Sequence, residues 1–144
     1  QHIDNNIIVN HNSPKTNSSQ FVKSILFDTS TGVFNGRTVV QKDAQKIVAY
    51  QSNKNLLLSK TARMNSNPQL EIYADDVKCS HGSTTGELDP EVLFYIQSRG
   101  ISRDDAIKLI INGFANELIK HVRHNKLYTY LQTKINEKLK EVIN

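Results

Sequence analysis

The chain has 144 residues and a formal net charge of +4, and hydrophobic residues make up 38% of it. This length suits one domain with a helical appendage. With 22% charged residues, 3 Pro and 6 Gly, the composition excludes disordered and fibrous chains. No apolar run approaches the roughly 20 residues that span a bilayer, and no signal peptide is visible. The single cysteine suits a reducing compartment, so we expect a soluble intracellular protein without a membrane partner.

Short β-prone runs separated by polar corners fill the first part of the chain. The predicted strands cover residues 7–9, 21–27, 37–40, 46–50, 56–58 and 69–73. The predicted corners cover residues 12–14, 28–32, 35–36, 51–55 and 65–68. Short strands at regular spacing fit a sandwich, a barrel or a stacked β-solenoid. The asparagine-rich corners favour the solenoid, although Asn35-Gly36 is also a hairpin signal.

Helices follow the strands. Asp89 before Pro90 predicts a helix start, with an aspartate N-cap and a proline in the first helical position. Ser102 followed by Asp105 approximates a capping box and starts a second helix. Apolar residues recurring at helical spacing predict a third helix from about Lys126.

The order of these elements predicts the fold class. We expect a mainly β protein with C-terminal α, divided into a β domain over residues 1–86 and a helical domain over residues 87–144. Basic residues gather in the last third, interrupted by Glu117, Glu137 and Glu141, as is typical of a solvated helix face. Net positive charge alone does not identify a nucleic-acid-binding protein. Nucleic-acid binding therefore stays a weaker alternative, and we expect no nucleic-acid partner.

Cys79 and His81 carry the most specific chemical signal. They stand two residues apart, behind Asp75 and Asp76. In an extended segment they project from the same face, because side chains alternate with a period of two. Thiolate and imidazole can then reach one metal ion or cluster, and Gly82 predicts a turn that leaves His81 near a surface. A zinc site needs more ligands than these two, so others must come from another chain or a labile cluster.

Other interpretations of this segment stay open. A lone cysteine often behaves as a small buried hydrophobe. Cys79 with His81 as its base is typical of a thiol-dependent or metal-dependent enzyme, although such partners usually come from separate elements. The string from Tyr73 to Asp76 matches the metal-binding signature of reverse-transcriptase palms. No apolar strand ending in aspartate precedes it, so the aspartates are better explained as a corner.

A longer pattern includes the same residues and resembles the SufD family of the SUF iron–sulfur cluster assembly system. The string Asp-Asp-Val-Lys-Cys-Ser-His-Gly at residues 75–82 points to SufD relative to its paralogue SufB. The other residues that carry the resemblance are His11, Pro14, Thr16, Lys23, residues 32–36, 44–46, 51–59, 73–74, 93–95 and 98–101. The chain resembles the C-terminal portion of these proteins, and Ser83 stands where the family commonly has alanine.

The resemblance implies a right-handed parallel β-helix followed by a helical domain. It implies a non-enzymatic scaffold that pairs with a SufB-like subunit through the β-helix. His81, with Cys79 as a less certain companion, would lie where a transient iron–sulfur cluster is shared with that partner. No cluster is expected to stay bound to the isolated chain. The sequence has no P-loop motif, so ATP hydrolysis is expected of a partner.

The turn between the first two helices carries the expectation for that ATPase partner. Phe94, Tyr95, Arg99, Gly100 and Ile101 form a compact knob that we expect to bind a SufC-like ATPase, with either Phe94 or Tyr95 packing as core.

The resemblance also implies further sequence before Gln1. Without the preceding repeats of the solenoid, apolar stacking surface would be exposed at that end. We therefore expect self-association there, such as a homodimer, or a reordered first segment. We expect a bacterial cytosol, with a plastid or apicoplast stroma as the alternative.

Overall fold

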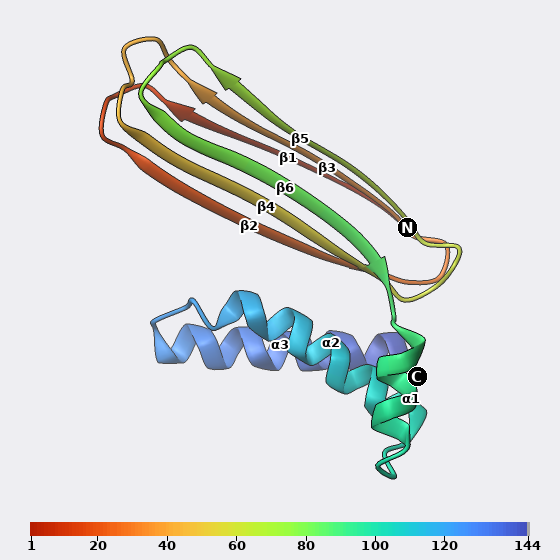
Figure 1. The fold of residues 1–144 in the computed structure, drawn as a ribbon. Coiled ribbons are helices and arrows are strands. Elements are labelled where there is room, and N and C mark those ends of the chain that lie inside the picture. The colour runs from red at the N-terminus through yellow and green to blue at the C-terminus, as the bar shows by residue number, and fades with distance from the viewer. Residues whose placement is uncertain (144) are drawn as a thin grey trace. The chain divides into compact units, whose positions relative to one another are not determined.

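The computed structural model describes residues 1–143, with side chains described up to residue 140. The chain divides into two compact units, Gln1–Glu87 and Leu88–Asn144. Over the described residues the first unit contains strands and the second contains helices (Figure 1). The strands are β1 His2–His11, β2 Asn17–Leu26, β3 Thr31–Val40, β4 Ile47–Leu57, β5 Arg63–Ile72 and β6 Val77–Glu87. The helices are α1 Pro90–Gln97, α2 Arg103–Ile119 and α3 Asn125–Ile143.

The strands form two parallel sheets, and consecutive strands alternate between them. One sheet has the order β1-β3-β5 and the other β2-β4-β6 (Figure 1). The register places His2 beside Thr31 and Thr31 beside Arg63, so the strands of a sheet lie side by side with their ends aligned. We call each pair of consecutive strands, such as β3 and β4, a rung. The predicted mainly β fold with C-terminal helices is confirmed, and the sheets are consistent with a β-helix-like arrangement.

The corners between strands repeat from one rung to the next. Lys15 N donates to Gln45 O at 2.8 Å, and Lys46 N donates to Asp76 O at 2.7 Å. Lys15 and Lys46 have φ values of 59° and 62°, a left-handed conformation found in tight turns. The corners predicted at 12–14 and 28–32 overlap observed turns.

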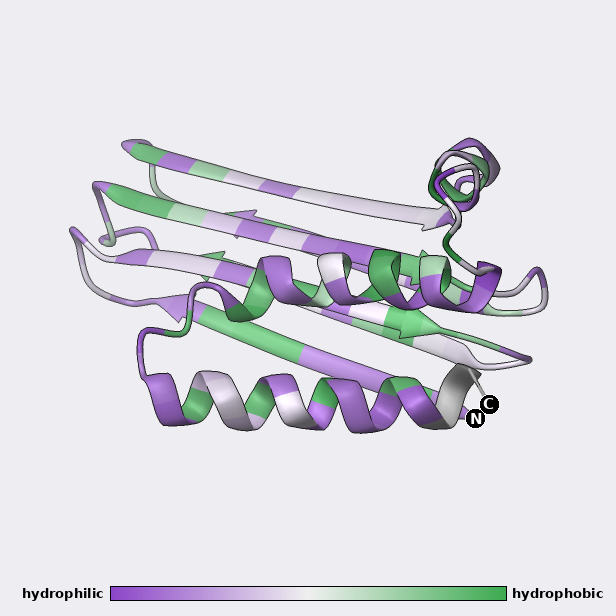
Figure 2. Cartoon of the chain, turned by 90° about the horizontal axis from the view of Figure 1, so that it is seen from below, coloured by the Kyte–Doolittle hydropathy of each residue, from purple (hydrophilic) through white to green (hydrophobic). Residues whose placement is uncertain are grey.

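A small apolar core lies near one set of corners. Its buried members are Val40, Ala44, Ile47, Ala49 and Ala74, and the partly buried Val77 and Cys79 pack against them. Farther along the strands, hydrophobic and hydrophilic residues follow one another in bands (Figure 2). The space between the sheets is apolar only in part, since Thr38, Asn53 and Asn55 are also buried.

The inward face of β4 is polar beyond this core. Gln51, Asn53 and Asn55 are 3%, 0% and 4% exposed. Asn53 Oδ1 accepts hydrogen bonds from Asn55 Nδ2 and from Ser66 Oγ of β5, each at 2.7 Å. The second bond joins the two sheets. The corners predicted at 51–55 and 65–68 are wrong, because both polar runs lie inside strands, where several of their side chains bond to one another.

Asn35-Gly36 also lies inside a strand, so the hairpin signal there is misleading. A Cβ added to Gly36 would stand 2.5 Å from the Phe34 ring and 2.5 Å from Gln51 Nε2. Phe34 is fully buried. Glycine suits this position because two neighbouring side chains fill the space that its own would occupy.

The helical unit begins with the predicted caps. Asp89 Oδ1 accepts from Glu91 N at 2.8 Å, and Pro90 is the first helical residue. Ser102 Oγ accepts from Asp105 N at 3.2 Å and donates to Asp105 Oδ2 at 2.8 Å. The starts predicted for α1 and α2 are confirmed, and α3 begins one residue before the predicted position. Within this unit α2 contacts both α1 and α3. Over the described residues, none of these helices is long and apolar enough to cross a membrane.

The replacement Gly36→Ala tests the close packing between the sheets. We expect it to lower the free energy of unfolding by about 1–3 kcal/mol, because the new methyl group displaces the Phe34 ring or the Gln51 amide. Gly86→Ala is the matched control, since an added Cβ there has no atom within 4 Å. Urea unfolding followed by circular dichroism measures both, and equal stabilities for the two variants would contradict the packing described.

Candidate functional site

Cys79 and His81 both lie in β6, which continues past Gly82 without a break. Their register partners in β4 are Ala49 and Gln51, which are 1% and 3% exposed. Neighbours in register point to the same side of a parallel sheet, so Cys79 and His81 face the space between the sheets. The prediction that they share a face is confirmed. The turn predicted after Gly82 is wrong.

His81 is exposed although it faces this space. The reason is that β6 is the last strand of its sheet: it pairs with β4 on one side, and no strand among the described residues pairs with its other side. The accessibility expected from a turn therefore arises from a sheet edge. An exposed imidazole beside an open edge can bind a metal that is also held by another chain.

Cys79 lies one pleat nearer the core and has a different environment. Its thiol is free and partly buried, and it packs against the apolar core next to Ala49. Burial raises the pKa of the Cys79 thiol above its usual value, although a hydrogen bond with the Ala49 backbone acts in the opposite direction. At neutral pH the group is therefore a thiol and a poor nucleophile.

Two ligands do not complete a metal site. Among the described residues, no group of three or more His, Cys, Asp or Glu side chains is arranged to hold a metal ion. Thiolate and imidazole do suit transition metals and their sulfide clusters. Asp76 N donates to Gln45 Oε1 at 2.9 Å, and Asp75 and Asp76 are both exposed between β5 and β6. The interpretation of these aspartates as a corner is confirmed.

The polar side chains next to His81 were missed by sequence reasoning. Gln51 stands between Gln20 and His81 in register. Ser83, the next inward residue of β6, donates through Oγ to Ser66 Oγ at 2.8 Å. The signal that could have found them is the recurrence of Gln20, Gln51 and His81 at nearly equal intervals, as in a repeat architecture.

The predicted knob lies at the end of α1 and in the turn that follows. Phe94, Tyr95 and Ile101 are 74%, 60% and 39% exposed. Arg99 Nη2 donates to Tyr95 Oη at 3.0 Å, and its guanidinium carbon lies 5.0 Å from the centroid of the Tyr95 ring. Gly100 has a φ of +84°, which favours glycine. The expectation that Phe94 or Tyr95 packs as core is wrong, because both are exposed.

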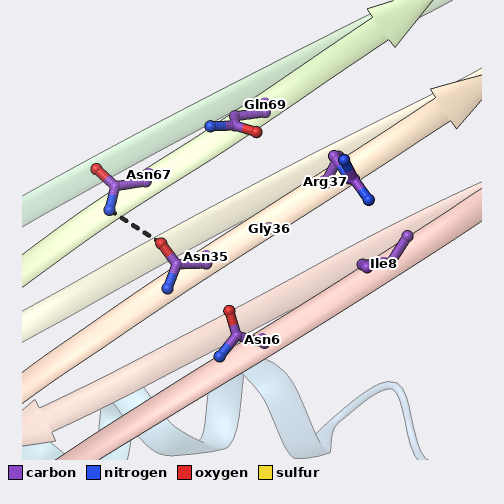
Figure 3. Close-up of a pocket in the computed structure, with 7 residues that line it drawn as sticks. All are labelled: Asn6, Ile8, Asn35, Gly36, Arg37, Asn67 and Gln69. Carbon is purple, nitrogen blue, oxygen red and sulfur yellow. Dashed lines mark hydrogen bonds between the residues drawn. The ribbon is translucent and has the colours of Figure 1, made fainter.

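A shallow groove of about 290 Å³ lies on the β1-β3-β5 sheet (Figure 3). Its lining residues are Asn6, Ile8, Asn35, Gly36, Arg37, Asn67 and Gln69. Asn67 Nδ2 donates to Asn35 Oδ1 at 3.0 Å, and Asn35 Nδ2 donates to Asp4 Oδ1 at 3.3 Å. Arg37 is paired with Glu71 at 3.3 Å. These groups bond to one another, and none of them is a residue of the Cys79 and His81 site.

Comparison with known proteins gives a consistent picture. The family model described as "SUF system FeS cluster assembly, SufBD core domain" matches residues 1–114. Over 129 residues the chain is 45% identical to the iron–sulfur cluster assembly protein SufD of Escherichia coli (strain K12), covering 90% of this chain and 30% of that protein.

Two further relatives come from Synechocystis and Arabidopsis thaliana. The chain is 42% identical over 116 residues to the iron–sulfur cluster assembly SufBD family protein slr0076 of Synechocystis, covering 81% of this chain and 25% of that protein. It is 41% identical over 115 residues to Protein ABCI7, chloroplastic, of Arabidopsis thaliana, covering 79% of this chain and 24% of that protein. The chain thus spans less than a third of the length of these relatives.

The environment of Cys79 predicts slow alkylation. Because burial raises the pKa of the thiol, the rate of reaction with iodoacetamide should stay low at pH 7 and rise only above about pH 8.5, where an ordinary cysteine ionises. Mass spectrometry of the folded chain across pH 6–10 measures this rate. The chain unfolded in urea, with the same single cysteine, is the control. Fast alkylation of the folded chain at pH 7 would show an activated thiolate instead.

Proposed function

Because the chain belongs to the SufBD core domain family of the SUF iron–sulfur cluster assembly system, we propose that it acts as a non-catalytic scaffold portion of a SufD-like subunit. His81, at the open edge of β6, carries this proposal. The exposed imidazole has access to solvent and a partner, while the described residues supply an incomplete ligand set. An incomplete set suits a site that forms a cluster with another chain and then releases it.

The β unit is the proposed contact for the SufB-like subunit. We take its two parallel sheets to be rungs of a right-handed parallel β-helix, spanning residues 1–86 and followed by the helical domain. Support comes from the free edges of β5 and β6, which are the last strands of their sheets. Backbone groups along such edges are ready to pair with strands of another chain. The same edges allow a homodimer when the partner is absent.

In this proposal the cluster is the cargo of the scaffold. His81 supplies one neutral imidazole nitrogen to the iron of the growing cluster. Cys79 supplies a second ligand only after its thiol loses a proton, which burial opposes until a metal ion takes the place of that proton. The remaining ligands come from the partner. No stable cluster is expected on this chain alone.

The helical unit is the proposed contact for a SufC-like ATPase. The exposed aromatic pair Phe94 and Tyr95, with Arg99 held over the Tyr95 ring, offers the residue types that dominate protein interfaces. The sequence has no P-loop, so ATP hydrolysis is assigned to the partner. The relatives in Escherichia coli and in the chloroplast of Arabidopsis thaliana favour a bacterial cytosol or a plastid stroma for this assembly.

A thiol-dependent enzyme is the alternative from another functional class. It needs Cys79 as a thiolate with His81 as its base. The raised pKa of the Cys79 thiol and its packing against apolar residues both disfavour that role.

The role of His81 is tested by His81→Ala in the chain co-expressed with SufB-like and SufC-like proteins from the same genome. We expect the complex to be recovered intact and the yield of assembled cluster, read by visible absorbance and iron content, to fall at least tenfold. Ser80→Ala, on the opposite face of the same strand, is the matched control. Cluster assembly at the unaltered level in His81→Ala would remove the basis of the proposal, as would turnover by the isolated chain.

The knob is tested by Phe94→Ala. If Phe94 is an anchor at the interface with the SufC-like ATPase, the dissociation constant should rise by roughly thirtyfold, which corresponds to about 2 kcal/mol. Calorimetric titration with the purified ATPase measures it. Leu109→Ala removes a similarly exposed apolar side chain from α2, outside the knob, and should leave affinity unchanged. Equal effects of the two variants would count against a localised knob.

A further inference from the structure

The amide of Gln51 is only half satisfied. Its Nε2 donates to Gln20 Oε1 at 3.1 Å, whereas its Oε1 is buried and has no hydrogen-bond partner. Gln51 itself is 3% exposed. A buried amide oxygen without a partner costs free energy that a single donor would recover. The position of that oxygen therefore calls for a donor close by.

The surroundings of Gln51 narrow the choice of donor. Within the sheet, Gln51 has Gln20 on one side and His81 on the other. Gln20 Oε1 already accepts from the Gln51 amide nitrogen, and Gln20 Nε2, which is also buried without a partner, makes no bond to Gln51 Oε1 in this arrangement. Gly36, across the space between the sheets, offers no side chain. His81 is the remaining neighbour in register, about 4.8 Å away along the hydrogen-bonding direction, and its imidazole carries an N–H.

His81 is also free to make this bond. Its side chain is exposed at the open edge of β6, so a change of rotamer displaces no packed neighbour. In the conformation of the structure Gln51 Oε1 is still without a partner. Rotation of the imidazole toward Gln51 would satisfy the amide oxygen and leave the second ring nitrogen directed away from it.

We propose that Gln51 is the positioning residue of His81: Gln51 Oε1 accepts a hydrogen bond from one imidazole N–H and thereby fixes the tautomer and orientation of the ring. The functional meaning rests on the function proposed above, in which His81 binds cluster iron. A hydrogen bond to the far nitrogen of a metal-binding histidine fixes which nitrogen is free to bind and commonly changes metal affinity or activity by 10–100-fold.

The test is nuclear magnetic resonance of the chain labelled with ¹⁵N-histidine, with His81→Gln assigning the His81 signals among the five histidines. We expect one neutral tautomer of His81 and an imidazole N–H signal that survives exchange with water. Gln51→Met, which keeps the length of the side chain but has no acceptor oxygen, should lose this signal and give mixed tautomers. Gln51→Glu keeps an acceptor and should retain the signal.

Two further variants keep the result interpretable. Thr38→Val alters another buried polar residue, in the other sheet, and should leave the His81 signal in place. If Gln51→Met fails to fold, Gln51→Asn withdraws the amide by one methylene and should give the same loss. An unchanged His81 signal in the folded Gln51 variant would overturn the proposal. So would an equal loss in Thr38→Val, because the effect would then be a general loosening of the interior.

Cluster assembly with the partners separates this inference from the proposed function. Where both hold, Gln51→Met lowers cluster yield about tenfold and Gln51→Glu restores most of it. If His81→Ala has no effect on assembly, the proposed function fails, and the resonance experiment still decides whether Gln51 positions His81. If His81→Ala abolishes assembly but the His81 imidazole signal is unchanged in the Gln51 variants, the proposed function stands and the positioning role is rejected.

Discussion

The structure depends on one constraint: each inward side chain must be compatible with its equivalent in the neighbouring rung. The strands of a sheet lie side by side with their ends aligned, so Gln20 is in register with Gln51, and Gln51 is in register with His81. Apolar positions stack into the small core, and polar positions must bond along the ladder or across to the other sheet. A change at one position is therefore felt by the residues in register with it, even though they are distant in sequence.

The same constraint explains the location of the candidate site. Inside the unit a polar ladder can satisfy its members from both sides, but at β6 the ladder ends. His81 is the last member of its row and has a neighbour on one side only. The imidazole of His81 is thus accessible where the stacking of the described rungs stops. The proposed metal ligand and the proposed partner surface therefore lie at the same edge for one physical reason.

The helices could be predicted from sequence and the strand bounds could not, because different forces determine them. A helix start depends on a few adjacent residues, and the caps at Asp89 and Ser102 form as expected. In β4 the polar run from Gln51 to Asn55 has the composition of a turn. It is nevertheless a strand, since the partners of these amides come from Val22, Ser66 and Thr85, far along the chain.

The candidate site also combines features that adjacent residues determine with features that depend on distant parts of the chain. The shared face of Cys79 and His81 follows from strand alternation alone. The exposure of His81 and the burial of Cys79 depend on where the sheet ends and where the core lies, which no local pattern records. Gln51 was assigned to a corner, and its place beside His81 appears only once the register is known.

The placement of Asn35-Gly36 within β3 also affects the chemical stability of the asparagine side chain. In a flexible turn this dipeptide is prone to deamidation, because the glycine nitrogen attacks the asparagine side-chain carbonyl to form a succinimide. That reaction requires the peptide to rotate. In β3 the backbone is held between two neighbouring strands, and the Asn35 amide is bonded to Asp4 and Asn67. A sequence that is chemically fragile in a loop is thus held away from the reactive geometry.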